Sequence, residues 1–266
     1  MLDLEFAELS DPGRSRDHNE DSIGHVLPSS PAQVQSQGWL FAVADGVGGH
    51  EKGEVASQLA IETMLGGFRK IPKGVVHASL LPKLVQDANA VVYDAGHARQ
   101  AGGPRMGSTL VACALRFDSA VVSHVGDSRC YLFRNGAGGP LTHDHTMADE
   151  QVRLGVLSQS EAAKSDGRHI LTRSLGSDLF VAADTITVNI IPGDVLLLCS
   201  DGLHGYVPDA SILRLINASS DLDAMAAALV AAANEAGGRD NVSVQLIRVR
   251  SVERMGLYRG RPYRLL

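Results

Sequence analysis

Cysteine is scarce in this sequence, and so are aromatic residues and long apolar runs. The three cysteines, Cys113, Cys130 and Cys199, have no CxxC spacing, and each lies in an apolar stretch. Such a small, odd number argues against a disulfide framework. We therefore expect three small, buried, hydrophobic side chains in a protein from a reducing compartment.

Membrane and nucleic-acid signals are also missing. The N-terminus lacks a basic segment followed by an apolar run, and the longest apolar stretch, Met225–Ala233, is too short to cross a bilayer. Lysine and arginine total 24 against 30 acidic residues, a net charge of −6, which is the wrong sign for a polyanion-binding protein. We expect a cytoplasmic protein with no membrane span and no nucleic-acid partner. Abundant alanine and scarce lysine indicate a bacterial source.

The 266 residues, 44% of them hydrophobic, can bury a sizeable core. Apolar residues at helical spacing predict helices at Glu54–Lys70, Leu80–Gln100 and Leu222–Glu235. Short apolar runs predict strands near Trp39–Asp45, Thr109–Phe117, Ala120–Gly126, Cys130–Arg134, Val181–Ile190, Val195–Ser200 and Asn241–Arg250. The helices come in blocks and do not alternate with strands, which favours an α+β fold of antiparallel sheets covered by helices.

Three segments have no core-forming pattern. Pro28–Gly38 is polar and rich in turn residues, so we expect a loop there. Asp149–Ser165 is a polar insert with some helical character between strand regions. Residues 251–266 form a basic tail, for which we expect a poorly ordered terminus.

Four apolar strand segments carry a carboxylate at one end. They are WLFAVADG, VSHVGDSR, VLLLCSDG and GGRDNVSVQLI, which contain Asp45, Asp127, Asp201 and Asp240. Any one aspartate has an ordinary explanation as a turn residue. Four that converged would repel one another, and a bound divalent cation would relieve that repulsion. The strand ends therefore predict a metal site if they meet in space.

The ligand chemistry indicates which metal is expected. An all-oxygen set, to which the Gly46 carbonyl is a further candidate, favours Mg²⁺ or Mn²⁺ and disfavours zinc. Calcium is the rival ion, although the EF-hand pattern is absent. Arg16 lies five residues before Asp21 in GRSRDHNEDS and is a candidate phosphate clamp. The alternative for Arg16 is a surface salt bridge in a charged turn.

Taken in order, RDHNED, VADGVGGH, GST, GDSR, LTRSLG, SDGL and GRDNVS resemble the type 2C metal-dependent protein phosphatases in their bacterial form. The resemblance covers roughly Ser10 to Val249. It implies a four-layer αββα sandwich of two antiparallel sheets flanked by helices. It also implies a catalytic domain over residues 1–250 with a flap at about 147–170, leaving 251–266 as the appended tail.

The resemblance assigns a role to each aspartate. It implies that Asp45 bridges two metals, with the Gly46 carbonyl as a further ligand. Asp201 and Asp240 would hold the first metal, and Asp21 would act on the second, mainly through water.

Further roles follow for the phosphate and the leaving group. Asp127 would serve a third, weaker metal together with Asp201, and Arg16 would hold the substrate phosphate. Eukaryotic relatives commonly have a histidine, proposed as the general acid, where this chain has Val47. His50 follows the glycines here and is the candidate acid. The alternatives for His50 are a structural role or the orientation of a metal-bound water.

The implied activity is hydrolysis of phosphoserine and phosphothreonine in proteins by a metal-bridged hydroxide, with two or three Mn²⁺ or Mg²⁺ ions. The implied partners are phosphorylated proteins, namely a serine/threonine kinase and its substrates. One alternative is a catalytically inactive regulatory module of the same fold, against which every expected aspartate is present. The other is a two-metal nuclease or nucleotide phosphohydrolase, which the acidic charge balance disfavours.

Overall fold

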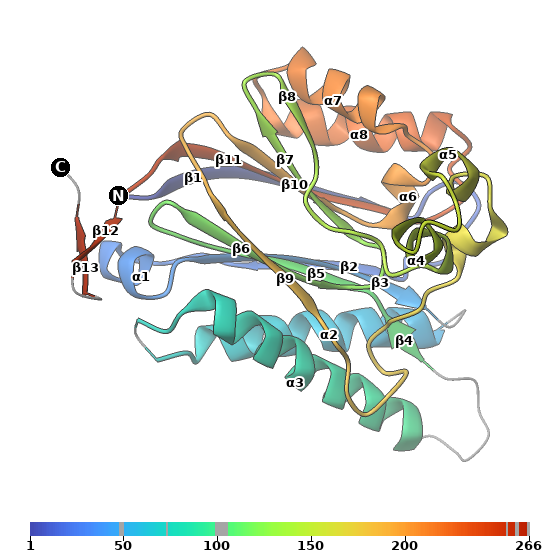
Figure 1. The fold of residues 1–266 in the computed structure, drawn as a ribbon, viewed down its shortest axis with the longest axis horizontal. Coiled ribbons are helices and arrows are strands. Elements are labelled where there is room, and N and C mark those ends of the chain that lie inside the picture. The colour runs from blue at the N-terminus through green and yellow to red at the C-terminus, as the bar shows by residue number, and fades with distance from the viewer. Residues whose placement is uncertain (48–50, 73, 99–105, 254, 259–260, 265–266) are drawn as a thin grey trace.

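Two antiparallel sheets packed face to face form the centre of the protein (Figure 1). The computed structural model describes residues 1–47, 51–72, 74–98, 106–253, 255–258 and 261–264. The first sheet has the order β1-β11-β10-β7-β8, with strands Asp3–Asp11, Val242–Ser251, Val195–Cys199, Arg129–Arg134 and Ala137–Pro140. The second has the order β2-β3-β5-β6-β9, with strands Asp21–Val26, Trp39–Val47, Leu110–Arg116, Ser119–Val125 and Asp184–Asn189, and short β4 (Gly107–Ser108) pairs with β3.

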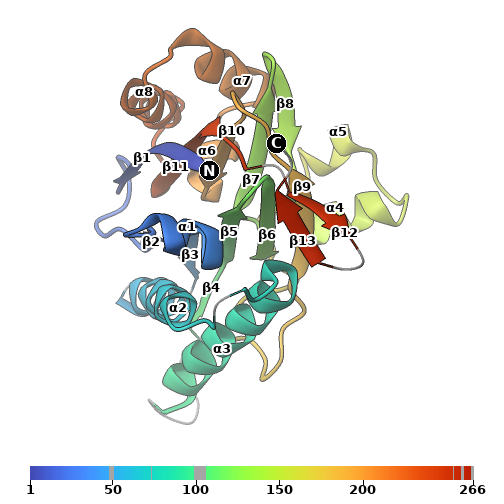
Figure 2. The same ribbon diagram turned by 90° about the vertical axis from the view of Figure 1, so that its left-hand side faces the viewer.

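Helices cover the outer face of each sheet, which gives four layers (Figure 2). The second sheet is covered by α2 (Glu51–Arg69) and α3 (His77–Ala98), and the first by α7 (Asp209–Ala218) and α8 (Leu222–Glu235). Among the described helices, none is both long and apolar enough to cross a bilayer.

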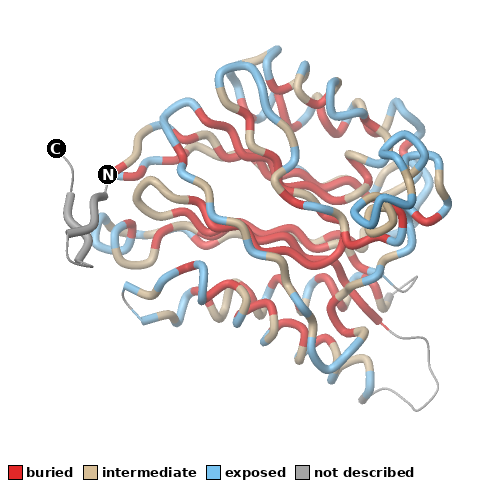
Figure 3. The backbone as a smooth tube through the Cα atoms, viewed as in Figure 1, coloured by how far each residue is buried: buried red, intermediate tan, exposed pale blue. Residues whose placement is uncertain are grey.

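Three apolar clusters fill the spaces between the layers. The central strands of both sheets are mostly buried along their length (Figure 3). Phe41 and Leu196 belong to the cluster between the sheets, Met64 and Phe68 to the cluster under α2 and α3, and Leu229 to the cluster under α8. All three cysteines are free and buried, as expected for small hydrophobic side chains. The α+β four-layer sandwich predicted from the sequence is confirmed.

Two predicted irregular segments contain regular structure. Within the predicted loop Pro28–Gly38, the chain forms the short helix α1 (Pro31–Ser36), because Ser30 caps its first turn and Pro31 occupies the first helical position. The tail contains the antiparallel hairpin of β12 (Met255–Tyr258) and β13 (Arg261–Arg264), where a poorly ordered terminus was expected. This hairpin lies at the end of the sandwich opposite the predicted flap (Figure 1).

The predicted flap lies between β8 and β9. It contains α4 (Met147–Arg153), α5 (Gln159–Ala162) and a 3₁₀ helix, Asp166–His169. Two backbone hydrogen bonds close its base: Met147 N donates to Ile170 O at 2.9 Å, and Thr172 N donates to His145 O at 2.8 Å. The segment therefore leaves and rejoins the sandwich at one place, next to the end where α6 (Asp201–His204) begins.

Candidate metal and phosphate site

Strand ends from both sheets bring five aspartates together at the flap end of the sandwich. Asp21 opens β2 and lies opposite Asp45 in the register of β3. Asp201 begins α6 directly after β10, Asp127 lies in the turn between β6 and β7, and Asp240 precedes β11. The four predicted strand-end aspartates and Asp21 thus converge, as the metal-site hypothesis requires.

Backbone contacts hold Asp45 in place. Asp45 N donates to Thr109 Oγ1 at 3.0 Å, and Thr109 N donates to Asp45 O at 2.8 Å. At Gly46, a Cβ atom would lie 2.1 Å from the carbonyl oxygen of Gly53 in the first turns of α2. Glycine is therefore required where β3 passes this close to α2.

Burial and mutual repulsion raise the pKa values of these carboxyl groups. Burial raises the pKa of Asp21 to about 7, with further repulsion from Asp201 and Asp240, although a hydrogen bond from Ser200 lowers it. Burial, then repulsion from Asp21 and Asp201, raises the pKa of Asp45 well above its ordinary value. The pKa values of Asp127 and Asp201 are raised by burial first and by neighbouring aspartates second. Without a cation, the group therefore favours protonation.

The donor set fits a hard divalent cation. Ser200 Oγ donates to Asp21 Oδ2 at 2.7 Å, whereas Asp21 Oδ1 and Asp201 Oδ1 are buried and have no hydrogen-bond partner. A buried carboxylate oxygen without a donor is unfavourable unless a cation coordinates it. The orphaned oxygens and the repulsion among the carboxylates both indicate Mg²⁺- or Mn²⁺-type ligation.

Arg16 lies at the edge of the aspartate group. Its Nε and Nη2 atoms each lie 3.0 Å from an oxygen of Asp240, Oδ1 and Oδ2 respectively, and its side chain is 48% exposed. The hydrogen bond to Asp240 is the main cause of its raised pKa. Arg16 therefore does form a salt bridge, but its partner is a predicted metal ligand and not a neighbour in a surface turn.

The loop that carries Arg16 is held by Asn241. Asn241 Nδ2 donates to Pro12 O and to His18 O, both at 2.9 Å, and Glu20 N donates to Asn241 Oδ1 at 2.8 Å. The residue after Asp240 thus fixes the segment that delivers Arg16. The other predicted catalytic residue, His50, lies outside the described residues.

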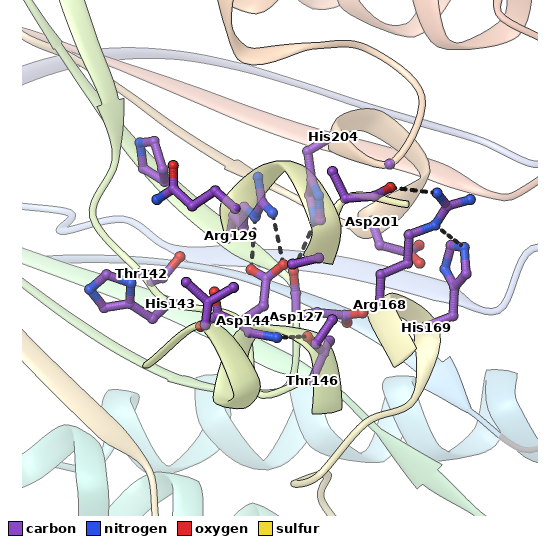
Figure 4. A pocket seen from close by; sticks show the side chains of 18 of the residues that line it. Asp127, Arg129, Thr142, His143, Asp144, Thr146, Arg168, His169, Asp201 and His204 are labelled. Atoms are coloured by element: carbon purple, nitrogen blue, oxygen red, sulfur yellow. Dashed lines mark hydrogen bonds and ion pairs between the residues drawn. The ribbon is translucent and has the colours of Figure 1, made fainter. Parts of the chain in front are cut away.

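A pocket of about 480 Å³ opens beside Asp127 and Asp201, and the flap forms its other wall (Figure 4). At its lining, Arg129 Nε and Nη2 donate to the two carboxylate oxygens of Asp144, both at 2.8 Å. His204 also borders the pocket, and its Nε2 donates to the Asp127 carbonyl oxygen at 2.9 Å. Burial lowers the pKa of His204 to about 3, so the imidazole is neutral at ordinary pH.

A second group of possible metal ligands, His124, His145 and Asp184, has its ligand atoms within 4.8 Å of one another. Several of its atoms have partners, although His124 Nδ1 is buried without a hydrogen-bond partner. Gly126 N donates to His145 Nδ1 at 3.1 Å, which places the imidazole proton on Nε2, and this nitrogen lies 3.4 Å from Asp184. Arg173 donates to Asp184 at 3.0 Å. The contacts of His145 with Gly126 and Asp184 indicate that this group supports the Gly126 turn.

Sequence reasoning did not assign roles to Thr109, Ser200 and Asn241. Each is next to, or hydrogen-bonded to, a predicted ligand: Ser200 precedes Asp201, Asn241 follows Asp240, and Thr109 ends the GST motif. Their positions in the motifs were therefore a usable signal. Their partners lie far away in the chain, so the bonds themselves could not be read from the sequence.

The chain is similar to known proteins over most of its length. A family profile described as Protein phosphatase 2C matches residues 14–246. The serine/threonine phosphatase stp of Listeria innocua is 35% identical over 256 residues, which cover 95% of this chain and 96% of the relative. The protein phosphatase PhpP of Streptococcus pneumoniae is 29% identical over 252 residues, which cover 92% and 97%.

The chain is also similar to solved structures of bacterial serine/threonine phosphatases. The Mycobacterium tuberculosis serine/threonine phosphatase PstP/Ppp superimposes with a TM-score of 0.81 at 31% identity and covers 94% of this chain and 100% of its own. A structure of the PstP catalytic domain with two manganese ions has a TM-score of 0.79 at 32% identity and the same coverage.

Proposed function

The chain belongs to the protein phosphatase 2C family of metal-dependent serine/threonine phosphatases, and we propose that its strand-end aspartates and Arg16 carry out hydrolysis of phosphoserine and phosphothreonine in proteins. The observation that carries the proposal is the convergence of five buried or half-buried aspartates beside one half-exposed arginine. Such a group binds divalent cations and the phosphate dianion together.

The aspartates would hold the metals. In the proposed arrangement, Asp45 would serve both of two ions, with the Gly46 carbonyl as a further ligand. Asp201 and Asp240 would complete the first ion, and Asp21 would serve the second, mainly through water. When bound, Mn²⁺ or Mg²⁺ ions supply an activated water nucleophile and neutralise the charge of the phosphate oxygens. The proposed number is two ions, with a third of lower affinity at the pair Asp127 and Asp201.

Arg16 would orient the phosphate. Its planar guanidinium already makes a two-point contact with the Asp240 carboxylate, and the same geometry suits two oxygens of a phosphate monoester. Its half-exposed position at the edge of the group lets a substrate reach it from solvent. Because phosphoryl transfer depends mainly on positioning and charge stabilisation, this orientation is the main contribution expected of Arg16.

A covalent cysteine route is not favoured. All three cysteines are buried in the apolar layers. Burial raises the pKa of the Cys199 thiol, and the neighbouring Cys113 thiol, followed by burial, raises the pKa of the Cys130 thiol. A thiolate nucleophile needs access to substrate, which none of the three buried thiols has, and a low pKa, which Cys130 and Cys199 lack. The nucleophile in the proposed reaction is therefore water.

The proposal extends to domain organisation and partners. Residues 1–250 would form the catalytic domain, with the flap at about 147–170, and residues 251–266 would be an appendage that the chemistry does not need. The proposed substrates are the phosphorylated products of a serine/threonine kinase, and the kinase itself is a proposed substrate.

The test is a comparison of hydrolysis rates in Mn²⁺ on three substrates: a phosphothreonine peptide, a nucleotide and single-stranded DNA. The chain truncated after residue 250 and the Asp201→Asn variant are measured in parallel. We expect hydrolysis of the peptide by the full and truncated chains and none by Asp201→Asn. Faster cleavage of the nucleotide or the DNA would overturn the proposal in favour of a two-metal nuclease or nucleotide phosphohydrolase. No hydrolysis of any substrate would indicate an inactive regulatory module.

A further inference from the structure

Two histidines hydrogen-bond the backbone of the turn that carries Asp127, one at Gly126 and the other at Asp127. Gly126 N donates to His145 Nδ1 at 3.1 Å, and His145 N donates to Gly126 O at 3.0 Å. His204 Nε2 donates to the Asp127 carbonyl oxygen at 2.9 Å (Figure 4). The backbone on both sides of Asp127 is therefore fixed by directional hydrogen bonds.

His204 lies on a different element from His145. It ends the short helix α6, whose first residue is Asp201, and residues three apart in a helix lie on the same side. Its hydrogen bond therefore joins the helix that carries Asp201 to the turn that carries Asp127, across 77 positions of sequence.

The other contacts at the start of α6 lead to β11 and β2 and not to the Asp127 turn. Its N-cap, Ser200, makes no side-chain capping hydrogen bond: its hydroxyl donates to Asp21 and accepts from Ser243 N at 3.0 Å, and Ser200 N donates to Ser243 O at 3.1 Å. Asp127 and Asp201 repel each other, so without the His204 hydrogen bond the turn could move away from the helix. A cation that binds between them would then have to bring them back together, which weakens its affinity.

We propose that His204 is a positioning residue: its hydrogen bond to the Asp127 carbonyl fixes the separation of Asp127 and Asp201 and so sets the affinity of this pair for a further divalent cation. The inference rests on the proposed function, in which these two aspartates share a cation of lower affinity. It adds a residue outside the ligand set and predicts that His204 affects this cation alone.

The side chain offers a matched pair of substitutions. The amide nitrogen of His204→Gln reaches about as far as Nε2 and can donate to the same carbonyl, whereas the amide nitrogen of His204→Asn falls short of it. Both replacements are polar and uncharged, as the neutral imidazole is. A role in packing alone would affect both variants alike, and a positioning role separates them.

The experiment is a titration of the metal-free protein with Mn²⁺, in which free Mn²⁺ is counted by its electron paramagnetic resonance signal. The wild type should show tight binding and a weaker class, and Asp127→Asn should remove the weaker class and so identify it. His204→Asn should weaken that class by about threefold to tenfold, the range that loss of one neutral hydrogen bond supports, and leave the tight class unchanged. His204→Gln should restore wild-type binding.

The proposal would be overturned if the wild type showed no weaker class of Mn²⁺ sites, or if His204→Asn weakened both classes equally. It would also be overturned if His204→Asn and His204→Gln bound Mn²⁺ equally well, or if neither differed from wild type. Because the readout is bound metal and not turnover, failure of this inference is distinguishable from failure of the proposed function. That failure would appear as a wild type that binds Mn²⁺ without hydrolysing the phosphothreonine peptide.

Discussion

Asp21 lies directly opposite Asp45 in the register of the paired strands β2 and β3. Opposed residues on antiparallel strands have close Cα atoms, and like charges at such positions are destabilising. Here the pair is held in a buried site, with Asp201 and Asp240 adding to the repulsion. The fold therefore maintains an unfavourable electrostatic arrangement, which a bound divalent cation would make favourable.

This repulsion predicts a pH-dependent stability of the metal-free protein. The pKa of Asp21 rises from an ordinary 3.8 to about 7 on folding, so between these values the folded chain holds the proton more tightly than the unfolded chain. The contribution of Asp21 to the free energy of unfolding is fully present below pH 3.8, and it is lost as the pH rises through about 7. We expect Asp21→Asn, which removes the charge, to stabilise the metal-free protein increasingly from pH 5 to pH 8.

The measurement is the difference in melting temperature between Asp21→Asn and wild type across that range. A difference is needed because buried neutral histidines such as His77, whose pKa is lowered to about 4 by burial, change stability in the opposite direction below pH 6.5. Asp87→Asn, on the exposed side of α3, is the control for loss of one charge. A difference that stays constant or shrinks toward pH 8 would contradict the account.

Loss of a central ligand should stop catalysis without unfolding the chain. We expect Asp45→Asn and Asp201→Asn each to lower kcat on a phosphothreonine peptide by at least about 10²-fold, because metal assistance contributes several kcal/mol to the rate. Circular dichroism should show an intact fold, since each substitution also relieves repulsion. Wild-type turnover in either variant would remove that residue from the proposed metal site.

Arg16 should affect substrate binding more than the chemical step. We expect Arg16→Ala to raise KM by roughly one to two orders of magnitude, the effect of losing a charge-assisted hydrogen bond. The existing pairing with Asp240 favours the lower end, because the substrate must displace that contact. Arg14→Ala, in the same exposed loop, is the control and should leave KM unchanged. An unchanged KM with a collapsed kcat would argue against a phosphate clamp.

His50 is tested by the choice of leaving group. If it protonates the serine or threonine oxygen, His50→Ala should slow phosphothreonine hydrolysis by about 10²–10⁴-fold. The same variant should hydrolyse p-nitrophenyl phosphate at nearly the wild-type rate, because p-nitrophenolate leaves without a proton. Equal losses on both substrates would assign His50 to the metal site or to the fold.

Much of the fold follows from local sequence signals. The predicted helix Leu222–Glu235 has the same bounds in the structure, because Asp221 caps its start and Gly237 and Gly238 end it with positive φ angles. β2 was not predicted, since DSIGHV is short and contains Gly24 and His25. The helix α1 was not predicted either, because its six residues are mostly polar and its capping serine also suits a loop.

Some features of the candidate site can likewise be predicted from the sequence, and others cannot. Strand-end aspartates are visible because strand and carboxylate are neighbours in the chain, as in the segment that ends at Asp45. The partner of Arg16 was not visible, because Asp240 is 224 positions away and nothing local to either residue indicates the pairing. The same holds for His204, whose hydrogen bond to the Asp127 turn depends on how β7 and β10 pair.

The most direct test of the central claim is removal and return of the metal. Protein stripped with EDTA and dialysed free of chelator is assayed on a phosphothreonine peptide, then titrated with Mn²⁺ or Mg²⁺ beside Asp45→Asn. The account predicts no hydrolysis by the stripped protein and full recovery with either ion, whereas the variant stays inactive at every concentration. Full activity of the stripped protein would show that the converging aspartates are not a catalytic metal site.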